Sequence, residues 1–312
     1  LPHPAENAFD SRAGVPGLRF FHPRLPGALD ALRRAEADVY FQHCAGVETG
    51  FTALHCRRHD GAFVYFAGSD TDFSLHEVRL NGLRDRAFFF WGLKNASLIV
   101  AQNEAQARSC RDKLGREAVV IPSAVALTDT DPSQKDGSVV WVGGLREVKQ
   151  PLEFVRLAQA MPERRFIMIG GGVSSAPDYA RKVQAEAEGV ANLTLTGRIP
   201  RDDVDTYLRR ASLLVNTSRV EGFPNAFLEA WQNATPVVSF VDVDGILHDE
   251  GVGVVCADGG EMAEVIARLL DDDDRRAVMG GRARDLIDER YGAPALARRY
   301  LELFQGLVTR GT

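Results

Sequence analysis

EGFPNAFLEA, the sequence from Glu221 to Ala230, places two carboxylates eight positions apart across a turn and a helix start. The glycine, proline and asparagine between them are typical of a turn that leads into the first residues of a helix. Strand-like runs come before and after this stretch, at residues 213–217 and 236–240. We therefore predict a strand-to-helix junction inside a βαβ unit, where α/β proteins bind phosphorylated ligands.

The two glutamates are expected to have different tasks at such a junction. The first residues of a helix present free N–H groups and a partial positive charge, which suit a diphosphate. Glu229 falls in the second turn of the predicted helix, where it can accept hydrogen bonds from ribose hydroxyls. Glu221 stays on the loop, near the group that the diphosphate carries. A surface helix with an acidic start is the alternative interpretation.

Both halves of the chain alternate short β-branched runs with helical stretches, which predicts parallel sheets covered by helices. The polar stretch TDTDPSQKDG, residues 128–137, is the predicted linker between the halves. A last helix is expected over residues 293–307. The predicted strands are 18–22, 38–43, 62–67, 97–102 and 118–121 in the first half, and 138–142, 165–169, 192–196, 212–216, 236–240 and 252–256 in the second.

The composition is that of an ordinary globular chain, with 45% hydrophobic and 26% charged residues among 312. A net charge of −6 gives no reason to expect nucleic acid as a partner. The four cysteines lack C-x-x-C spacing, so we expect reduced thiols and a cytoplasmic location. No apolar run approaches the roughly 20 residues of a membrane span, and the polar start is unlike a signal peptide.

Three more segments follow predicted strands in the second half. VGGLREVK, residues 142–149, is a glycine turn followed by Arg146 and Lys149, two cations that can hold phosphate oxygens. GGG at 170–172 and TGRIP at 196–200 close the next two strands. Because the carboxyl ends of parallel strands share one edge, we expect all four segments to meet where ligands gather. Taken singly, each segment could be a plain turn or a helix cap.

EGFPNAFLEA resembles the E-x7-E motif of the family 4 retaining glycosyltransferases, and the other three segments match that family in the same order. The resemblance implies the α/β fold called GT-B, with two Rossmann-like, doubly wound parallel-sheet domains that face a cleft. It covers nearly the whole second half and, more loosely, residues 38–125. The expected parts are an acceptor-side domain at 1–130, a nucleotide-sugar donor domain at 131–292, and a C-terminal helix at 293–312 that packs back on the first domain.

The resemblance further implies transfer of a hexose from a nucleoside-diphosphate sugar to a hydroxyl of a glycan, lipid or small molecule, with retention and without a metal or cofactor. The catalytic roles would fall on Glu221, Arg146 and Lys149. Family members often carry an arginine where this chain has Gly144, but a subgroup has it after the leucine, as Arg146 is here. The implied donor-binding residues are Glu229, Gly222, Phe223, Pro224, Asn225, Gly143, Gly144, Gly171, Arg198 and Ile199, the last through its main chain.

The first half is expected to hold the acceptor side, where the resemblance is looser. Many family members carry a histidine where the second strand ends, and this chain has Ser69 and Asp70 there instead. His43 and Asn103, each at the end of a neighbouring strand, are further candidates, although a packed or solvated histidine is the alternative for His43. The D-x-D patterns at 70–72, 129–131 and 242–244 are interpreted as chance matches to a metal motif of another fold.

The first half also lacks an opening strand with a glycine-rich turn, the feature expected where a Rossmann-like half begins. We expect that about one βαβ unit, on the order of 30 residues, is missing from the N-terminus. A divergent first half that begins late is the alternative.

Three functions stay open: a transferase, a nucleotide-sugar-binding module or remnant without transferase activity, and another GT-B relative such as an epimerase or phosphorylase. The E-x7-E string argues against the third. The aromatic run at 88–91, which follows Arg84 and Arg86, allows a peripheral contact with the inner membrane face, but a buried helix face is the favoured interpretation. The sequence defines neither the base, the sugar, the acceptor nor the oligomeric state.

Overall fold

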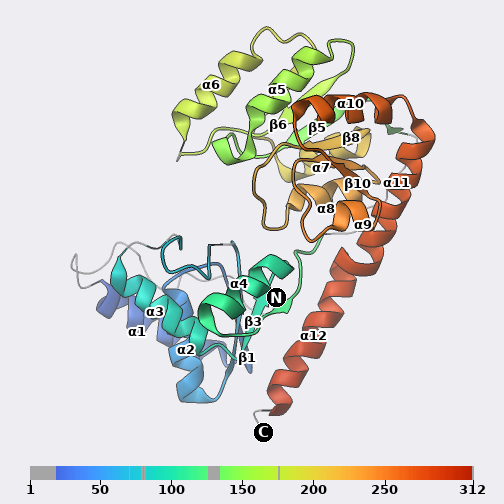
Figure 1. Cartoon of the computed structure of the whole chain (residues 1–312). Helices are drawn as coiled ribbons and strands as arrows, with labels where there is room; N and C mark the ends of the chain where they lie inside the picture. The colour runs from blue at the N-terminus through green and yellow to red at the C-terminus, as the bar shows by residue number, and fades with distance from the viewer. Residues whose placement is uncertain are drawn as a thin grey trace. The chain divides into compact units, whose positions relative to one another are not determined.

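The computed structural model describes residues 19–69, 71–78, 80, 82–125, 134–174 and 176–310. By contact the chain divides into two compact units, of which the first comprises Leu1–Pro122 with Arg298–Thr312 and the second Ser123–Ala297. Each unit is built around its own parallel sheet with helices packed on it (Figure 1).

The first unit contains a four-stranded sheet in the order β1-β2-β3-β4, with all pairs parallel. The register pairs Tyr40 with Phe63 and Tyr65 with Ile99. The two central strands, β2 and β3, consist mostly of buried aromatic and aliphatic residues, which is typical of strands covered on both faces, whereas β1 exposes Phe41 and His43. The elements are β1 (Val39–His43), β2 (Ala62–Phe66), β3 (Leu98–Ala101) and β4 (Val119–Val120), with η1 (Phe20–Arg24), α1 (Leu25–Ala35), α2 (Glu48–His59), α3 (Leu83–Lys94) and α4 (Glu104–Leu114).

The second unit contains a six-stranded parallel sheet in the order β10-β9-β8-β5-β6-β7. Its strands are β5 (Val139–Val142), β6 (Phe166–Ile169), β7 (Leu193–Gly197), β8 (Leu213–Asn216), β9 (Val237–Ser239) and β10 (Gly253–Val255). Its helices are η3 (Glu147–Lys149), α5 (Pro151–Ala160), α6 (Pro177–Ala187), α7 (Arg201–Arg210), α8 (Asn225–Trp231), α9 (Ile246–Asp249), α10 (Gly259–Leu270), α11 (Asp273–Leu286) and η4 (Ile287–Tyr291).

Two hydrophobic clusters lie on the two faces of the second sheet. Alternation along a strand sends successive side chains to opposite faces, so Val139 and Trp141 of β5 join one cluster and Val140 joins the other. Residues of α5, α6 and α10 complete the first cluster, and residues of α7, α8 and α11 complete the second. Helices therefore pack on both faces of the sheet.

The last helix, α12 (Ala293–Arg310), begins in the second unit and continues from Arg298 in the first. Phe41 of β1 contacts it, with ring centroids 6.0 Å from Tyr300 and 6.4 Å from Phe304. Among the helices that the structure describes, none is both long and apolar enough to cross a bilayer.

The predicted strand at 18–22 is wrong, because Phe20–Arg24 forms a kinked, irregular turn, with His22 extended, that leads into α1. A short apolar run does not by itself distinguish a strand from a buried helical segment. Here Phe20 packs against Phe51 of α2 and Phe88 of α3, with ring centroids 5.5 and 5.6 Å away. Phe89 is fully buried as well, so the aromatic run at 88–91 serves mainly as core.

Candidate functional site

The strand order of the second sheet reverses between β5 and β8. β5 pairs with β6 on one side and with β8 on the other, so the chain winds outward in both directions from this pair. The carboxyl edge at such a reversal is where open α/β sheets bind their ligands. The glycine turn at 143–144 follows β5, and Glu221 lies on the loop that follows β8. The parallel sheet thus brings the predicted segments to one edge.

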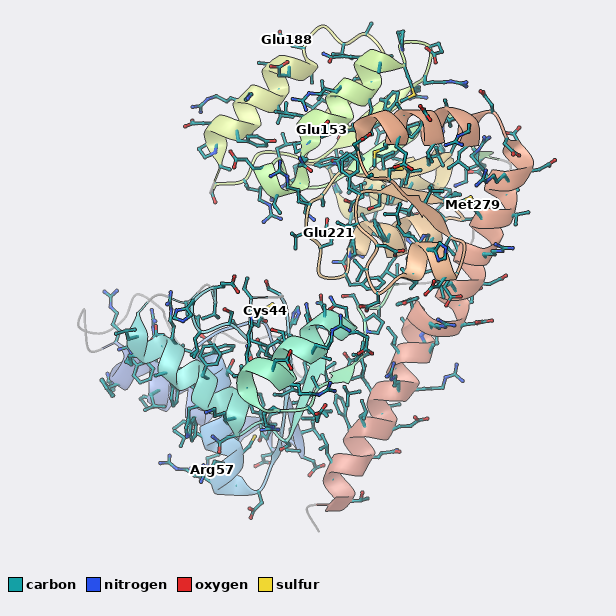
Figure 2. The ribbon with its side chains drawn as sticks, in the orientation of Figure 1. Cys44, Arg57, Glu153, Glu188, Glu221 and Met279 are labelled. Atoms are coloured by element: carbon teal, nitrogen blue, oxygen red, sulfur yellow. The ribbon has the colours of Figure 1, made fainter. Side chains whose placement is uncertain are left out.

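Lys149 and Glu221 form an ion pair at this edge. Lys149 Nζ lies 2.5 Å from Oε1 and 2.6 Å from Oε2 of Glu221, and Asn216 Nδ2 donates to the same Oε1 at 3.2 Å. The Glu221 side chain is 9% exposed and that of Lys149 is 21% exposed. Glu221 is labelled in Figure 2 on the loop after β8. A cation and a carboxylate predicted separately from the sequence therefore meet as one charge pair.

Thr217 fixes the turn that carries Lys149. Its buried hydroxyl accepts a hydrogen bond from Trp141 Nε1 at 3.0 Å and lies 2.8 Å from the Lys149 carbonyl oxygen and 3.0 Å from that of Gln150. The main chain adds a bond from Arg219 N to Val148 O. The loops after β5 and β8 are thereby joined through buried contacts.

The glycine turns after β5 and β6 approach each other closely. Gly143 N donates to Ile169 O at 3.0 Å, and Gly170 has a φ of +151°. A Cβ at Gly170 would lie 1.7 Å from Gly143 O, so only glycine fits there. Gly171 lies against Arg198 of the TGRIP loop. Arg146 is half buried, and its Nε has no hydrogen-bond partner among the described residues.

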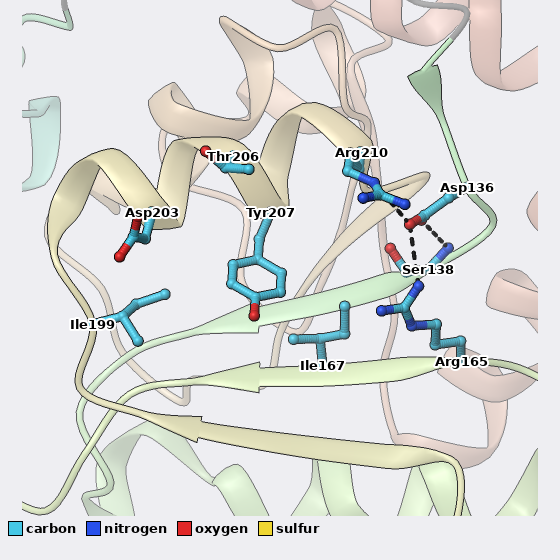
Figure 3. Close-up of a pocket in the computed structure, with 9 residues that line it drawn as sticks. All are labelled: Asp136, Ser138, Arg165, Ile167, Ile199, Asp203, Thr206, Tyr207 and Arg210. Carbon is cyan, nitrogen blue, oxygen red and sulfur yellow. Dashed lines mark hydrogen bonds and ion pairs between the residues drawn. The ribbon is translucent and has the colours of Figure 1, made fainter.

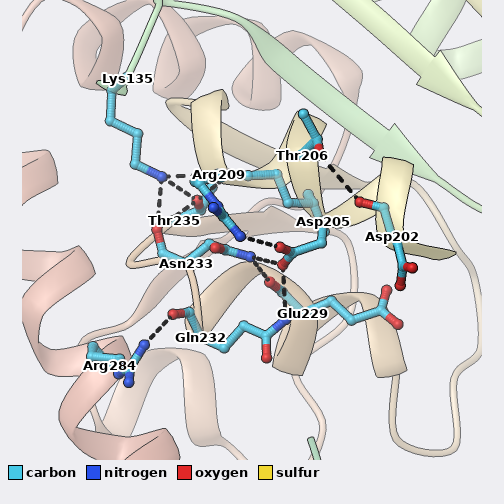
Figure 4. Close-up of polar contacts among 11 residues, drawn as sticks. Lys135, Asp202, Asp205, Thr206, Arg209, Glu229, Gln232, Asn233, Thr235 and Arg284 are labelled. Atoms are coloured by element: carbon cyan, nitrogen blue, oxygen red, sulfur yellow. Dashed lines mark hydrogen bonds and ion pairs between the residues drawn. The ribbon is translucent and has the colours of Figure 1, made fainter. Parts of the chain in front are cut away.

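Glu229 lies on α8 and meets the helix that follows the TGRIP loop. Its Oε1 is 3.0 Å from Nη2 of Arg201, the first residue of α7. Burial raises the pKa of the Glu229 carboxyl, Arg201 opposes that shift, and Asp205 adds to it. The Asp205 carboxylate accepts hydrogen bonds from Gln232 and Asn233, which directly follow α8 (Figure 4). Glu229 is thus held between two neighbouring loops of the carboxyl edge.

The middle of EGFPNAFLEA is mostly structural. Phe223 is 8% exposed and packs against Tyr291 and Trp231, with ring centroids 5.3 and 6.4 Å away. Pro224 is buried, whereas Asn225 is exposed as the first residue of α8. The helix has seven residues, which gives it only a small dipole.

The predicted acceptor-side residues lie at the carboxyl ends of strands in the first unit. His43 is exposed, with its ring 4.9 Å from that of Phe66. Ser69 is exposed and its hydroxyl lies 3.1 Å from that of Thr71. Asn103 is buried, and its Oδ1 caps α4 by accepting from Gln106 N at 2.8 Å. Asp70 lies outside the described residues. Only His43 and Ser69 among these side chains are exposed where the structure describes them.

Asp72 is a residue that the sequence analysis passed over. It is 3% exposed, and its Oδ2 accepts from Tyr65 Oη at 2.8 Å, Gly68 N at 2.7 Å and Ser69 N at 3.3 Å. Burial raises the pKa of its carboxyl, and these three hydrogen bonds oppose the shift. Asp72 therefore shapes the loop after β2. The D-x-D pattern at 70–72, interpreted above as a chance match, includes this residue.

Three further residues that the sequence did not predict contact the candidate site residues. Asn216 donates to the Glu221 carboxylate, and the Thr217 hydroxyl donates to the Lys149 carbonyl oxygen. Arg201 forms an ion pair with Glu229. Two polar residues where an apolar run ends were the signal available for Asn216 and Thr217. Nothing in the sequence pattern marked Arg201.

Residues 136–272 match the family model described as Glycosyl transferases group 1. The chain is 26% identical over 179 residues to Glycosyltransferase 1 domain-containing protein 1 of Xenopus tropicalis, which covers 55% of this chain and 51% of the relative. It is 31% identical over 164 residues to a D-inositol 3-phosphate glycosyltransferase of Corynebacterium aurimucosum, covering 47% and 38%. The chain spans about half or less of the length of these relatives.

The structure is similar to HepE of Anabaena in complex with UDP, with a TM-score of 0.76 over 94% of this chain and 84% of that chain at 18% identity. The fold is GT-B. A second structure of HepE contains UDP and glucose, and covers 93% of this chain and 83% of that chain with the same TM-score at 17% identity. The GT-B comparison agrees with the two parallel-sheet units predicted from the sequence.

Proposed function

We propose that this chain is a family 4 retaining glycosyltransferase, which moves a hexose from a nucleoside-diphosphate sugar to a hydroxyl of a glycan, lipid or small molecule. The observation that carries the proposal is the Lys149–Glu221 pair at the strand reversal between β5 and β8. The group 1 match over residues 136–272 and the UDP bound by HepE support it.

The diphosphate would lie against the glycine turns. There, Gly143, Gly144 and Gly171 have no side chain to keep a ligand from the backbone, and the main-chain N–H groups of Gly144 and Gly171 would donate to it. Arg146 and Lys149 would supply the positive charge, because guanidinium and ammonium groups donate charge-assisted hydrogen bonds to phosphate oxygens. Main-chain groups of Arg198 and Ile199 would contact the base.

Glu229 would hold the ribose. A buried carboxylate can accept two hydroxyl hydrogen bonds, and a hydroxyl pair replaces part of the solvation that burial has removed. Arg201 keeps the carboxylate in place through the ion pair at 3.0 Å.

The reaction breaks the bond between the anomeric carbon and the diphosphate oxygen, which leaves an oxocarbenium-like sugar and a charged leaving group. Arg146 and Lys149 would stabilise that charge as it develops. The acceptor oxygen would attack from the face that the diphosphate leaves, and its proton would pass to a phosphate oxygen. Glu221 would position the sugar hydroxyls. The proposed steps use no metal, no cofactor and no protein nucleophile.

Nucleotide affinity tests the site directly. We expect calorimetry with UDP, GDP and ADP to find at least one ligand, and expect Glu229→Ala and Arg146→Ala each to weaken it by about tenfold or more, equal to about 1.4 kcal/mol. Glu186→Ala and Arg181→Ala, at exposed positions of α6, are the matched controls. Unchanged affinity in both site variants would contradict the proposal.

Product analysis by NMR separates the functions that share this site. A new glycosidic bond with the donor's anomeric configuration supports the retaining transferase. Nucleotide binding without transfer to any acceptor in a broad screen would favour the binding module instead.

A further inference from the structure

A cavity of about 400 Å³ lies beneath α7, on the face of the sheet formed by β5 and β6 (Figure 3). Its apolar walls are the side chains of Ile167 from β6, Ile199 from the TGRIP loop and Tyr207 from α7. The volume is in the range of small-molecule sites. Ser138 and Arg165 stand just before β5 and β6, so the cavity extends toward the amino ends of the strands, whereas the proposed donor site lies at their carboxyl ends.

The side-chain hydroxyl of Ser138, which lines the cavity, is buried and unpaired within the part of the chain that the structure describes. Ser138 is 0% exposed, and its Oγ has no hydrogen-bond partner among the described residues. Its own amide is satisfied, because Ser138 N donates to Asp136 Oδ1 at 3.1 Å. An unpaired buried hydroxyl costs free energy in the folded state, and such groups are uncommon in proteins.

A second hydroxyl points into the same space. Figure 3 shows the Tyr207 ring between α7 and the sheet with its Oη directed at the strands. Tyr207 and Ser138 come from different elements, a helix and the residue before a strand. Two unrelated segments thus each contribute a hydroxyl to one cavity.

The two ends of the cavity carry opposite charge. At the amino ends of the strands, Arg165 Nη1 and Arg210 Nε each lie 3.3 Å from the same oxygen of Asp136. Two guanidinium groups face one carboxylate, so one positive charge is left over. Near Ile199, the carboxylate of Asp203 lines the opposite end (Figure 3).

We propose that this cavity binds a small single-ring compound that carries an anionic group at one end and a hydrogen-bond donor at the other. The ring lies between Ile167, Ile199 and Tyr207. Arg165 and Arg210 bind the carboxylate or phosphate, because a guanidinium matches such an anion with paired N–H donors. Asp203 accepts from the donor group, and the Ser138 hydroxyl gains a partner. The site shares only Ile199 with the proposed donor site, through its side chain here and its main chain there, and it does not depend on the proposed function.

Three probes of similar size test this chemistry with the full chain. 4-Hydroxybenzoate has the ring, the anion and the donor; benzoate lacks the donor; 4-hydroxybenzyl alcohol lacks the charge. We expect 4-hydroxybenzoate to shift the isoleucine methyl NMR signals of Ile167 and Ile199, and to bind more tightly than either analogue by about tenfold, the worth of one charge-assisted hydrogen bond.

Two variants locate the site. Ser138→Ala removes the unpaired hydroxyl, so we expect an unchanged or higher melting temperature together with weaker binding of 4-hydroxybenzoate. The double variant Arg165→Gln/Arg210→Gln changes two side chains that are more than half exposed, and should weaken binding by about tenfold or more. Arg181→Gln, an exposed arginine of α6, should leave the affinity unchanged.

Absence of methyl shifts at Ile167 and Ile199 with 4-hydroxybenzoate up to its solubility limit would overturn the proposal. Equal affinity in the wild type, Ser138→Ala and the arginine double variant would overturn it as well. Both results are independent of nucleotide binding and sugar transfer, so they do not affect the proposed function.

Discussion

Lys149 Nζ lies 2.5 and 2.6 Å from the two carboxylate oxygens of Glu221, although the residues are 72 positions apart in the sequence. The side chains come from the turns after β5 and β8, the two strands between which the sheet order reverses. Each neutralises the other in the structure. In the proposed reaction Lys149 would bind the diphosphate and Glu221 would bind the sugar. Donor binding therefore has to separate the two side chains, because each would then contact a different part of the same ligand.

This relationship predicts that Glu221→Gln separates binding from transfer. An amide at this position no longer attracts Lys149, which becomes more available to a diphosphate, so UDP affinity should be unchanged or higher. The transfer rate should fall on the order of 10²-fold to 10³-fold, the loss typical when one transition-state contact is removed. Calorimetry and product formation measure the two quantities, with Glu186→Gln as the control. Weakened UDP binding with full transfer activity would contradict the assignment.

Thr217→Val should loosen the turn that carries Lys149. Valine has nearly the same shape, but it leaves Trp141 Nε1 buried without its acceptor at 3.0 Å. We expect the free energy of unfolding to fall by about 1–3 kcal/mol, and UDP affinity to fall with it. Urea unfolding measures the first effect. Thr206→Val changes an exposed hydroxyl that bonds only to the carbonyl of Asp202 in its own helix, and should cost less than about 0.5 kcal/mol. Equal costs in the two variants would show that Thr217 is not an anchor.

The elements of the second unit could be predicted from the sequence because their signals are local. The predicted strands at 138–142, 165–169 and 212–216 each coincide with an observed strand to within one residue. Apolar runs that end in glycine or in a polar residue mark both the strand and the edge where it stops. Because paired parallel strands end at the same edge of the sheet, the segments that follow them lie close together, as the turns after β5 and β8 do.

The partners of the site residues could not be predicted, because they depend on tertiary contacts. The same turn chemistry that placed Phe223 near a ligand is equally suited to a residue that packs on Tyr291. Asn103 follows a strand as a binding residue would, yet its side chain caps a helix. Asp72 shapes the loop after β2 only because folding buries its carboxylate beside Tyr65.

Gly170→Ala should disrupt the carboxyl edge. The backbone there has a φ of +151°, and an added Cβ would lie 1.7 Å from Gly143 O, so the turns after β5 and β6 would have to move apart. We expect the free energy of unfolding to fall by at least about 3 kcal/mol from strain and overpacking, with loss of nucleotide binding. Gly281→Ala is the control, because this position in α11 has open space, and alanine there should add about 0.5–1 kcal/mol. A wild-type unfolding curve for Gly170→Ala would contradict the observed turn.

Lys135 predicts a pH dependence in the second unit. Its Nζ donates to Asn233 O at 2.7 Å and to Thr235 Oγ1 at 2.6 Å (Figure 4). Burial lowers the pKa of its ammonium group from 10.5 to about 8, and Asp136 opposes that shift. Between pH 8 and 10.5 the folded chain holds Lys135 mostly neutral while the unfolded chain still binds the proton. Stability must therefore rise with pH across this window.

Lys135→Met removes the titration and leaves every other ionisable group in place. Relative to this variant, the wild type should gain unfolding free energy as the pH rises from about 8 to about 10.5, with a slope of at most about 1.4 kcal/mol per pH unit. Below pH 8 the difference between the two should be constant, because both states of the wild type are then protonated. Urea unfolding at a series of pH values measures this, with the exposed Lys182→Met as the control. A difference that stays flat through pH 8 to 10.5 would mean that Lys135 keeps its ordinary proton affinity despite burial.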